Sequence, residues 1–183
     1  DDGSSWKPFQ LNLPIVPITD LAIKNDNLIA TTQGRSIWLI DHLTPLHQLN
    51  TSMAGSDFTL FKPMPSYRMG PGFSFGRPSK TDGKNHPGGV MIHYYLKDTA
   101  KVSASIEIME MSGTVIKKFA TKPDKKANDE QLRIKPGGNR FVWNMRYKNA
   151  EGFDGLIMWA GSLTGPKAMP GTYKARLTVN GKS

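Results

Sequence analysis

Four histidines are the residues of this sequence best suited to hold a metal ion: His42, His47, His86 and His93. They form no His-x-x-x-His pair, and none has a glutamate at the spacing of a zinc motif. His42 and His47 stand five residues apart, with Pro45 between them. The chain contains no cysteine, which removes thiolate ligands, disulfides and a cysteine nucleophile. We therefore expect ordinary surface histidines, no metal site and no cofactor.

The remaining catalytic patterns are equally sparse. Asp20 and Asp41 are the likeliest carboxylate pair, and glycoside hydrolysis would need them about 5–10 Å apart in a cleft. Aspartates at strand ends usually serve turns, and this is the interpretation we favour. No G-x-S-x-G motif is present. The glycine-rich run at 70–76 lacks the Lys-Ser/Thr of a phosphate-binding loop. We predict no catalytic residue in this chain.

Two aromatic residues are candidates for ligand binding. Trp159 lies in a glycine-rich loop (MWAGSLTG) and would be a stacking platform for a sugar or for a neighbouring domain. Tyr95 alternates with Tyr94, so it lies on the opposite face of its strand. The competing interpretation, which we favour for Trp159, is that it plugs one end of a β-sandwich, because large aromatic side chains gain most from burial.

Composition indicates an all-β chain and excludes several partners. The 183 residues include 18 Gly and 13 Pro, which suits many turns. The net charge of +9 is concentrated in residues 71–183, which hold 19 Lys/Arg and 9 Asp/Glu. These charges are dispersed, without an arginine stripe, so we expect a solvated surface and no nucleic acid. No apolar run approaches the ~20 residues of a membrane span.

Three short apolar runs separated by polar turns occupy residues 16–41. They predict three antiparallel strands of one small sheet. Such a sheet has two faces and two open edges, so it is only marginally stable alone and normally stacks against neighbours. A propeller blade meets this description, because radial repetition protects its edges. Thr44 is expected to cap a single helical turn with Pro45 at its first position. A strand at residues 58–62 would close the blade, which gives a first domain over residues 1–65.

Prolines and glycines indicate a linker at 66–89, followed by a second domain at 90–183. In four segments of this domain, apolar and polar residues alternate with period 2. Their apolar residues predict antiparallel sheets packed face to face. Trp143 and Tyr147 are expected in the core. The fold class predicted is therefore all-β: a partial propeller-blade sheet followed by an immunoglobulin-like β-sandwich.

The segments TQGRSIWLID (32–41) and FTLFKPMPSYR (58–68) resemble the end of the β-propeller in bacterial proteins related to sortilin/Vps10 and BNR (sialidase-like) propellers. The segments IHYYLK, VSASIEIMEMSGTVIKKF, GGNRFVWNMRY and MPGTYKARLTV resemble a FlgD-like immunoglobulin-type domain. The resemblance implies a large exported parent, often described as a glycosyl hydrolase. Arg35 lies in the GRS motif, but the Asp-box is absent, and one blade cannot assemble a sialidase site. No functional residue of the family transfers to this chain.

We therefore expect a non-catalytic structural and interaction module of an exported bacterial protein, located in the periplasm, on the cell surface or outside the cell. Its partners would be the remaining blades of the parent, or another copy of the chain, through strand pairing. The alternative is a carbohydrate-binding accessory domain of a secreted glycoside hydrolase or sialidase-like enzyme, with a glycan as ligand. A third hypothesis is that the parent is a hydrolase and that this chain contributes one wall of its active site. The first residues lack an initiator methionine and the last follow a strand-like run, which we expect of a fragment.

Overall fold

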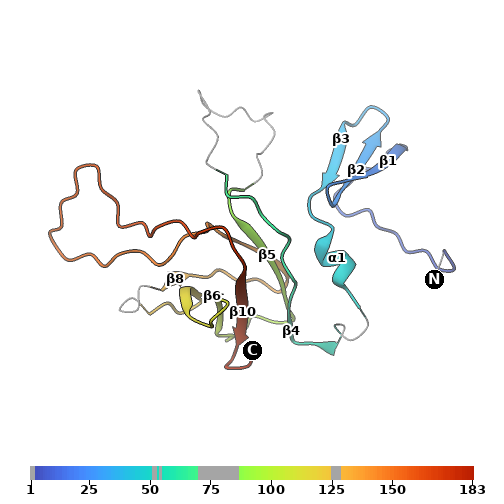
Figure 1. Cartoon of the computed structure of the whole chain (residues 1–183). Helices are drawn as coiled ribbons and strands as arrows, with labels where there is room; N and C mark the ends of the chain where they lie inside the picture. Colours follow the sequence, from blue (N-terminus) through green and yellow to red (C-terminus); the bar gives the residue numbers. More distant parts are fainter. Residues whose placement is uncertain (1–2, 51–52, 54, 70–86, 125–128) are drawn as a thin grey trace. The chain divides into compact units, whose positions relative to one another are not determined.

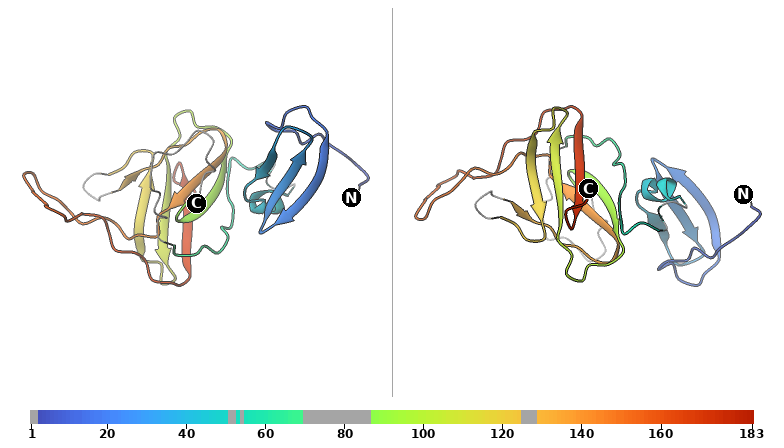
Figure 2. Two further views of the ribbon diagram at one scale, coloured as in Figure 1. Left: turned by 90° about the horizontal axis from the view of Figure 1, so that it is seen from above. Right: turned by 90° about the horizontal axis from the view of Figure 1, so that it is seen from below.

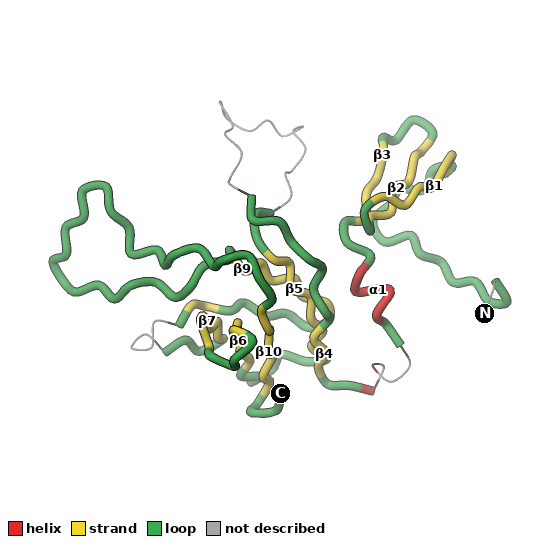
Figure 3. Tube along the Cα trace, viewed as in Figure 1, coloured by secondary structure: helices red, strands yellow, loops and turns green. Residues whose placement is uncertain are grey.

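The computed structural model is an all-β structure with one short helix among its described residues (Figures 1 and 3). It describes residues 3–50, 53, 55–69, 87–124 and 129–183. The chain divides into two compact units, Asp1–Leu49 and Asn50–Ser183. Within the described residues, no helix has the length and apolar character needed to cross a bilayer.

The first unit is built on a three-stranded antiparallel sheet with the order β1-β2-β3. Its strands are β1 (Ile18–Lys24), β2 (Asn27–Thr32) and β3 (Ile37–Ile40). Asn25 and Asp26, with φ of 50° and 61°, form the two-residue turn between β1 and β2. This is the left-handed conformation that type I′ hairpin turns require and that Asn and Asp tolerate best. The three strands predicted from residues 16–41 are confirmed.

A single helical turn, α1 (Thr44–Gln48), follows the sheet and has a proline in its first turn, as predicted. The capping role predicted for Thr44 is wrong, because the N-cap is Leu43 and no side chain caps the helix. The Thr44 hydroxyl donates instead to the Asp26 carboxylate, a charged acceptor that binds a donor more strongly than a neutral one. The Leu43 N–H also donates to the Asp26 carbonyl oxygen at 2.7 Å. The β1–β2 turn therefore anchors the helix.

The second unit consists of two sheets, and Figure 2 shows them from two sides. One has the order β4-β5-β9, formed by β4 (Phe58–Leu60), β5 (Val90–Leu96) and β9 (Gly137–Trp143). The other has the order β10-β6-β7-β8, formed by β10 (Tyr173–Val179), β6 (Ala104–Glu110), β7 (Val115–Ala120) and β8 (Glu130–Gln131). Neighbouring strands are antiparallel except for β7 and β8, which are parallel.

The core of the second unit is made from the inward faces of both sheets. Ile92, Tyr94 and Leu96 come from β5, whereas Ile106 and Ile108 come from β6, and all five are almost completely buried. Each such side chain contributes about 1.5–3 kcal/mol of transfer free energy. The period-2 pattern predicted these inward faces, which are confirmed. The arrangement agrees with a β-sandwich, since apolar side chains from two sheets form one cluster.

The pairing of strand β4 differs from what the sequence predicted. The segment at 58–62 does not close the sheet of the first unit, because β4 pairs with β5 through Phe58↔Leu96 and Leu60↔Tyr94. Phe58 and Leu60 pack against the core of the second unit, and this burial selects the sheet that the strand joins. Of the predicted linker, residues 70–86 lie outside the described residues.

The pairing of β4 with β5 leads to a prediction about stability. Phe58→Ala should lower the free energy of unfolding by about 2 kcal/mol, because the ring packs on the core. Phe153→Ala is the matched control, since the same change removes an exposed ring and should have almost no effect. Urea denaturation of residues 50–183 measures both. Equal effects of the two substitutions would contradict the assignment of β4 to this unit.

Candidate interaction surfaces

Trp159, one of the two predicted ligand-binding residues, lies on a long excursion of the second unit. Residues 149–165 form the middle of the connection between β9 and β10 and extend away from the sheets (orange in Figure 1). The Trp159 side chain is 100% exposed, so the expectation that it plugs the sandwich is wrong. The ring stays in solvent because this segment leaves the sandwich instead of folding over its end. Four further apolar side chains of the excursion are exposed: Phe153, Leu156, Ile157 and Met158.

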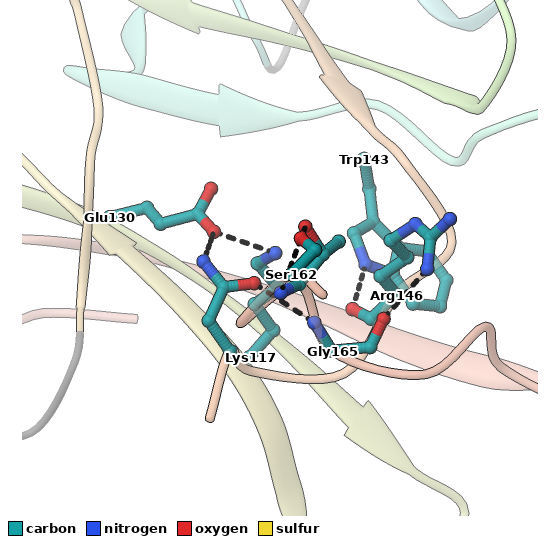
Figure 4. Close-up of polar contacts among 8 residues, drawn as sticks. Lys117, Glu130, Trp143, Arg146, Ser162 and Gly165 are labelled. Carbon is teal, nitrogen blue, oxygen red and sulfur yellow. Dashed lines mark hydrogen bonds and ion pairs between the residues drawn. The ribbon is translucent and has the colours of Figure 1, made fainter. Parts of the chain in front are cut away.

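A chain of polar contacts holds the base of this excursion, which we call the arm (residues 149–165; Figure 4). The buried Lys117 ammonium lies 2.7 Å from Glu130 Oε1. The same carboxylate oxygen accepts a hydrogen bond from the Asn149 amide at 3.4 Å. Asn149 Oδ1 in turn accepts from the Gly165 N–H at 3.1 Å. One residue at each end of the arm is thereby tied to β7 and β8.

The sheet that contains β9 contributes a second anchor (Figure 4). Arg146 Nη1 donates to the Gly165 carbonyl at 2.8 Å, and Trp143 Nε1 donates to the Arg146 carbonyl at 2.9 Å. The Tyr147 hydroxyl donates to Glu110 Oε1 at 2.8 Å. This hydrogen bond, and secondly burial, raise the pKa of Tyr147 from 10.0 to about 12, so the hydroxyl keeps its proton, and with it the hydrogen bond, to a higher pH than an ordinary tyrosine. The base of the arm is fixed while its apolar end faces solvent.

Tyr95, the other predicted ligand-binding residue, is half-buried on β5. It lies opposite Gly138 on one side and Thr59 on the other, on the face that points away from the core. No described contact brings it to Trp159. Ligand binding by either residue therefore stays a prediction, and the pair does not form one stacking surface.

The sheet of the first unit exposes apolar side chains on both faces. The register places Leu21 opposite Ala30 and Ile23 opposite Leu28, which puts all four on one face. Leu21 and Ile23 are 61% and 68% exposed. The other face carries Ile37 and Leu39, which are 70% and 57% exposed. All seven residues of the edge strand β1 are exposed.

A groove of ≈ 750 Å³ opens between the two sheets of the second unit. Its inner wall includes Ile92, Ile108 and Trp143, and its outer wall is the segment 62–68 with residues 168–175. No pattern in the sequence predicted this groove. Alternation within β10 shows which of its side chains face inward, but it does not show how completely the two sheets cover each other.

Asp20 does not have the turn role expected of an aspartate at a strand end, because it lies inside β1, beside a shift in the register of its pairing with β2. Its carboxylate accepts a hydrogen bond from the neighbouring Leu21 N–H at 2.8 Å. Among the described residues, no three His, Asp or Glu side chains lie close enough together to hold a metal ion.

Comparison with protein-family models, curated proteins and solved structures finds no match for this chain. Three surfaces are therefore the candidates for interaction: the apolar sheet faces, the arm and the groove.

The anchoring of the arm is testable at Gly165. A Cβ atom there would lie 2.3 Å from the carbonyl oxygens of both Tyr147 and Lys148. Gly165→Ala should therefore displace the arm and lower the free energy of unfolding by about 1–3 kcal/mol. Gly138→Ala is the control, because a Cβ there meets no atom within 4 Å. Chemical denaturation followed by tryptophan fluorescence measures both, and equal stabilities would contradict the close approach.

Proposed function

We propose that this chain is a non-catalytic structural and interaction module of a larger exported protein, in which the sheet of the first unit is one layer of a stack. The observation that carries the proposal is the pair of apolar faces on this sheet. An antiparallel sheet with one face in water normally carries polar residues there. Here Leu21 and Ile23 on one face, and Ile37 and Leu39 on the other, are exposed.

Covering these faces would be strongly favourable. Burying four such side chains is worth about 1.5–3 kcal/mol each, which is comparable to the whole stability of a small domain. A propeller blade has both faces covered by its neighbours, and this supports the resemblance to sortilin/Vps10 and BNR propellers. The exposed edge strand β1 offers unpaired backbone groups, which suits pairing with a strand of the parent or of another copy.

We extend the proposal to the second unit as an immunoglobulin-like, FlgD-like sandwich that accompanies the blade. The support is its strand order: β5 and β6, adjacent in sequence, lie in different sheets, and β10 returns to pair with β6. Such crossing between sheets is typical of Greek-key sandwiches. In this proposal the unit presents the arm, with Trp159, to a partner of the exported parent.

The layer proposal predicts that the first unit does not fold alone. Residues 1–49 should show no cooperative thermal transition, because the only buried apolar side chains of the unit are Ala30 and Leu43 among its described residues. Circular dichroism measures this, and residues 50–183 serve as the control that should melt cooperatively. A monomeric, cooperative melt of residues 1–49 would overturn the proposal. The parent gene should also encode further copies of the three-strand pattern.

A carbohydrate-binding function is the second candidate, and the full exposure of Trp159 favours it. Trp159→Ala should then weaken retention of the chain on insoluble chitin or cellulose about tenfold or more, which is the loss of roughly 1.4 kcal/mol. Tyr67→Ala is the control, because it removes another exposed aromatic ring that lies outside the arm. Depletion of the chain from solution by the insoluble polysaccharide measures the change. Absence of retention of the unmodified chain would exclude this candidate for those glycans.

A further inference from the structure

The arm exposes its main chain as well as its side chains. All residues from 151 to 162 are exposed, and none of them belongs to a helix or a strand. Within this stretch the structure shows one backbone hydrogen bond, from the Leu156 N–H to the Phe153 carbonyl oxygen at 3.1 Å. Exposed loops with few backbone hydrogen bonds open at little cost and are preferred sites of proteolytic cutting. The main chain of the arm is therefore accessible to an endoprotease.

The side chains of the arm restrict the class of protease. Phe153 and Trp159 are 72% and 100% exposed. Every other aromatic side chain in residues 87–183 is half-buried or buried. The arm contains no lysine and no arginine. An enzyme whose specificity pocket takes aromatic side chains therefore has accessible sites on the arm, whereas an enzyme that cuts after basic residues has none there.

The chain on each side of the arm is held by contacts that do not involve the exposed stretch. Before the arm, the Lys148 N–H donates to the Ile116 carbonyl oxygen of β7 at 3.0 Å. After the arm, the Ala168 N–H donates to the Met145 carbonyl oxygen at 2.7 Å. A cut between residues 153 and 160 breaks neither of these hydrogen bonds. It also leaves intact the polar contacts at the base of the arm.

Strand β10, which follows the arm, is held in the sandwich by its own pairing. It pairs with β6 along its whole length, from Tyr173↔Glu110 to Val179↔Ala104. Leu177 and Val179 belong to the hydrophobic core cluster. An antiparallel ladder and the burial of apolar side chains hold two strands together whether or not the chain between them is continuous. The fragment that follows a cut in the arm therefore stays in its sheet.

We propose that the arm is a processing site for an endoprotease that cuts after aromatic residues, and that the cut chain keeps its fold as two associated fragments. Water adds across the peptide bond after Phe153 or Trp159. Its hydroxyl goes to the carbonyl carbon and its hydrogen to the nitrogen, so a carboxyl terminus and an amino terminus form. The cut turns the arm from a closed loop into two open ends. The inference goes beyond the proposed function, and its outcome does not test the layer formed by the first unit.

The probe is chymotrypsin, whose specificity pocket takes large apolar side chains, added in small amounts to the whole chain. Mass spectrometry of timed samples should show that the earliest cut in residues 87–183 follows Phe153 or Trp159. The two fragments made by this cut should elute together in gel filtration and separate only in denaturant. An earliest cut elsewhere in residues 87–183, or separation of the fragments in native buffer, would overturn the proposal.

Substitutions in the arm separate recognition of its side chains from cutting of the unfolded chain. Phe153→Ser combined with Trp159→Ser should slow cutting of the arm about tenfold or more, because the protease loses both aromatic side chains. Tyr67→Ser is the matched control, since it removes an exposed aromatic ring outside the arm and should leave that rate unchanged. Thermal denaturation checks that each variant is folded. Equal rates in the double variant and the unmodified chain would contradict the proposal.

Discussion

Burial of apolar side chains between two sheets is the interaction on which the second unit depends. Tyr94 and Leu96 from one sheet, and Ile106 and Ile108 from the other, are shielded almost completely from water. The arm and the groove exist only because this core fixes β6, β9 and β10 relative to each other. The polar anchor of the arm follows from it, since Lys117 can be buried only where Glu130 and the Phe119 ring are held beside its ammonium.

The two units differ in how their apolar side chains are distributed over the faces of their sheets. In the second, alternation places one face of each sheet inside, so polar residues such as Lys174 and Arg176 occupy the outer face of β10. In the first, polar and apolar residues are not separated onto different faces, and leucine and isoleucine occur on both. A sheet of this kind gains most of its stability from other layers. The same physical effect thus accounts for a folded sandwich and for a sheet suited to association.

Exposed apolar side chains gather on the first sheet and at the end of the arm, and a groove lies between the two sheets of the second unit. These surfaces differ in geometry. The sheet offers flat apolar faces, the arm offers a projecting tryptophan, and the groove offers a concave apolar wall. Different geometries select different partners, because a sheet packs on another sheet and a ring stacks on a flat ligand.

The strands and their inward faces could be predicted from the sequence, because alternation and turn chemistry are local properties. The inward positions of β5, β6 and β10, the single turn at Pro45 and the three short strands of the first unit were all predicted correctly. Three features could be seen only in the folded chain: β4 pairs with β5, Trp159 lies in solvent, and a groove lies beside β10. These features depend on pairing between residues far apart in the chain. Short apolar strands of similar pattern fit more than one sheet, and the choice is made by which pairing buries more surface.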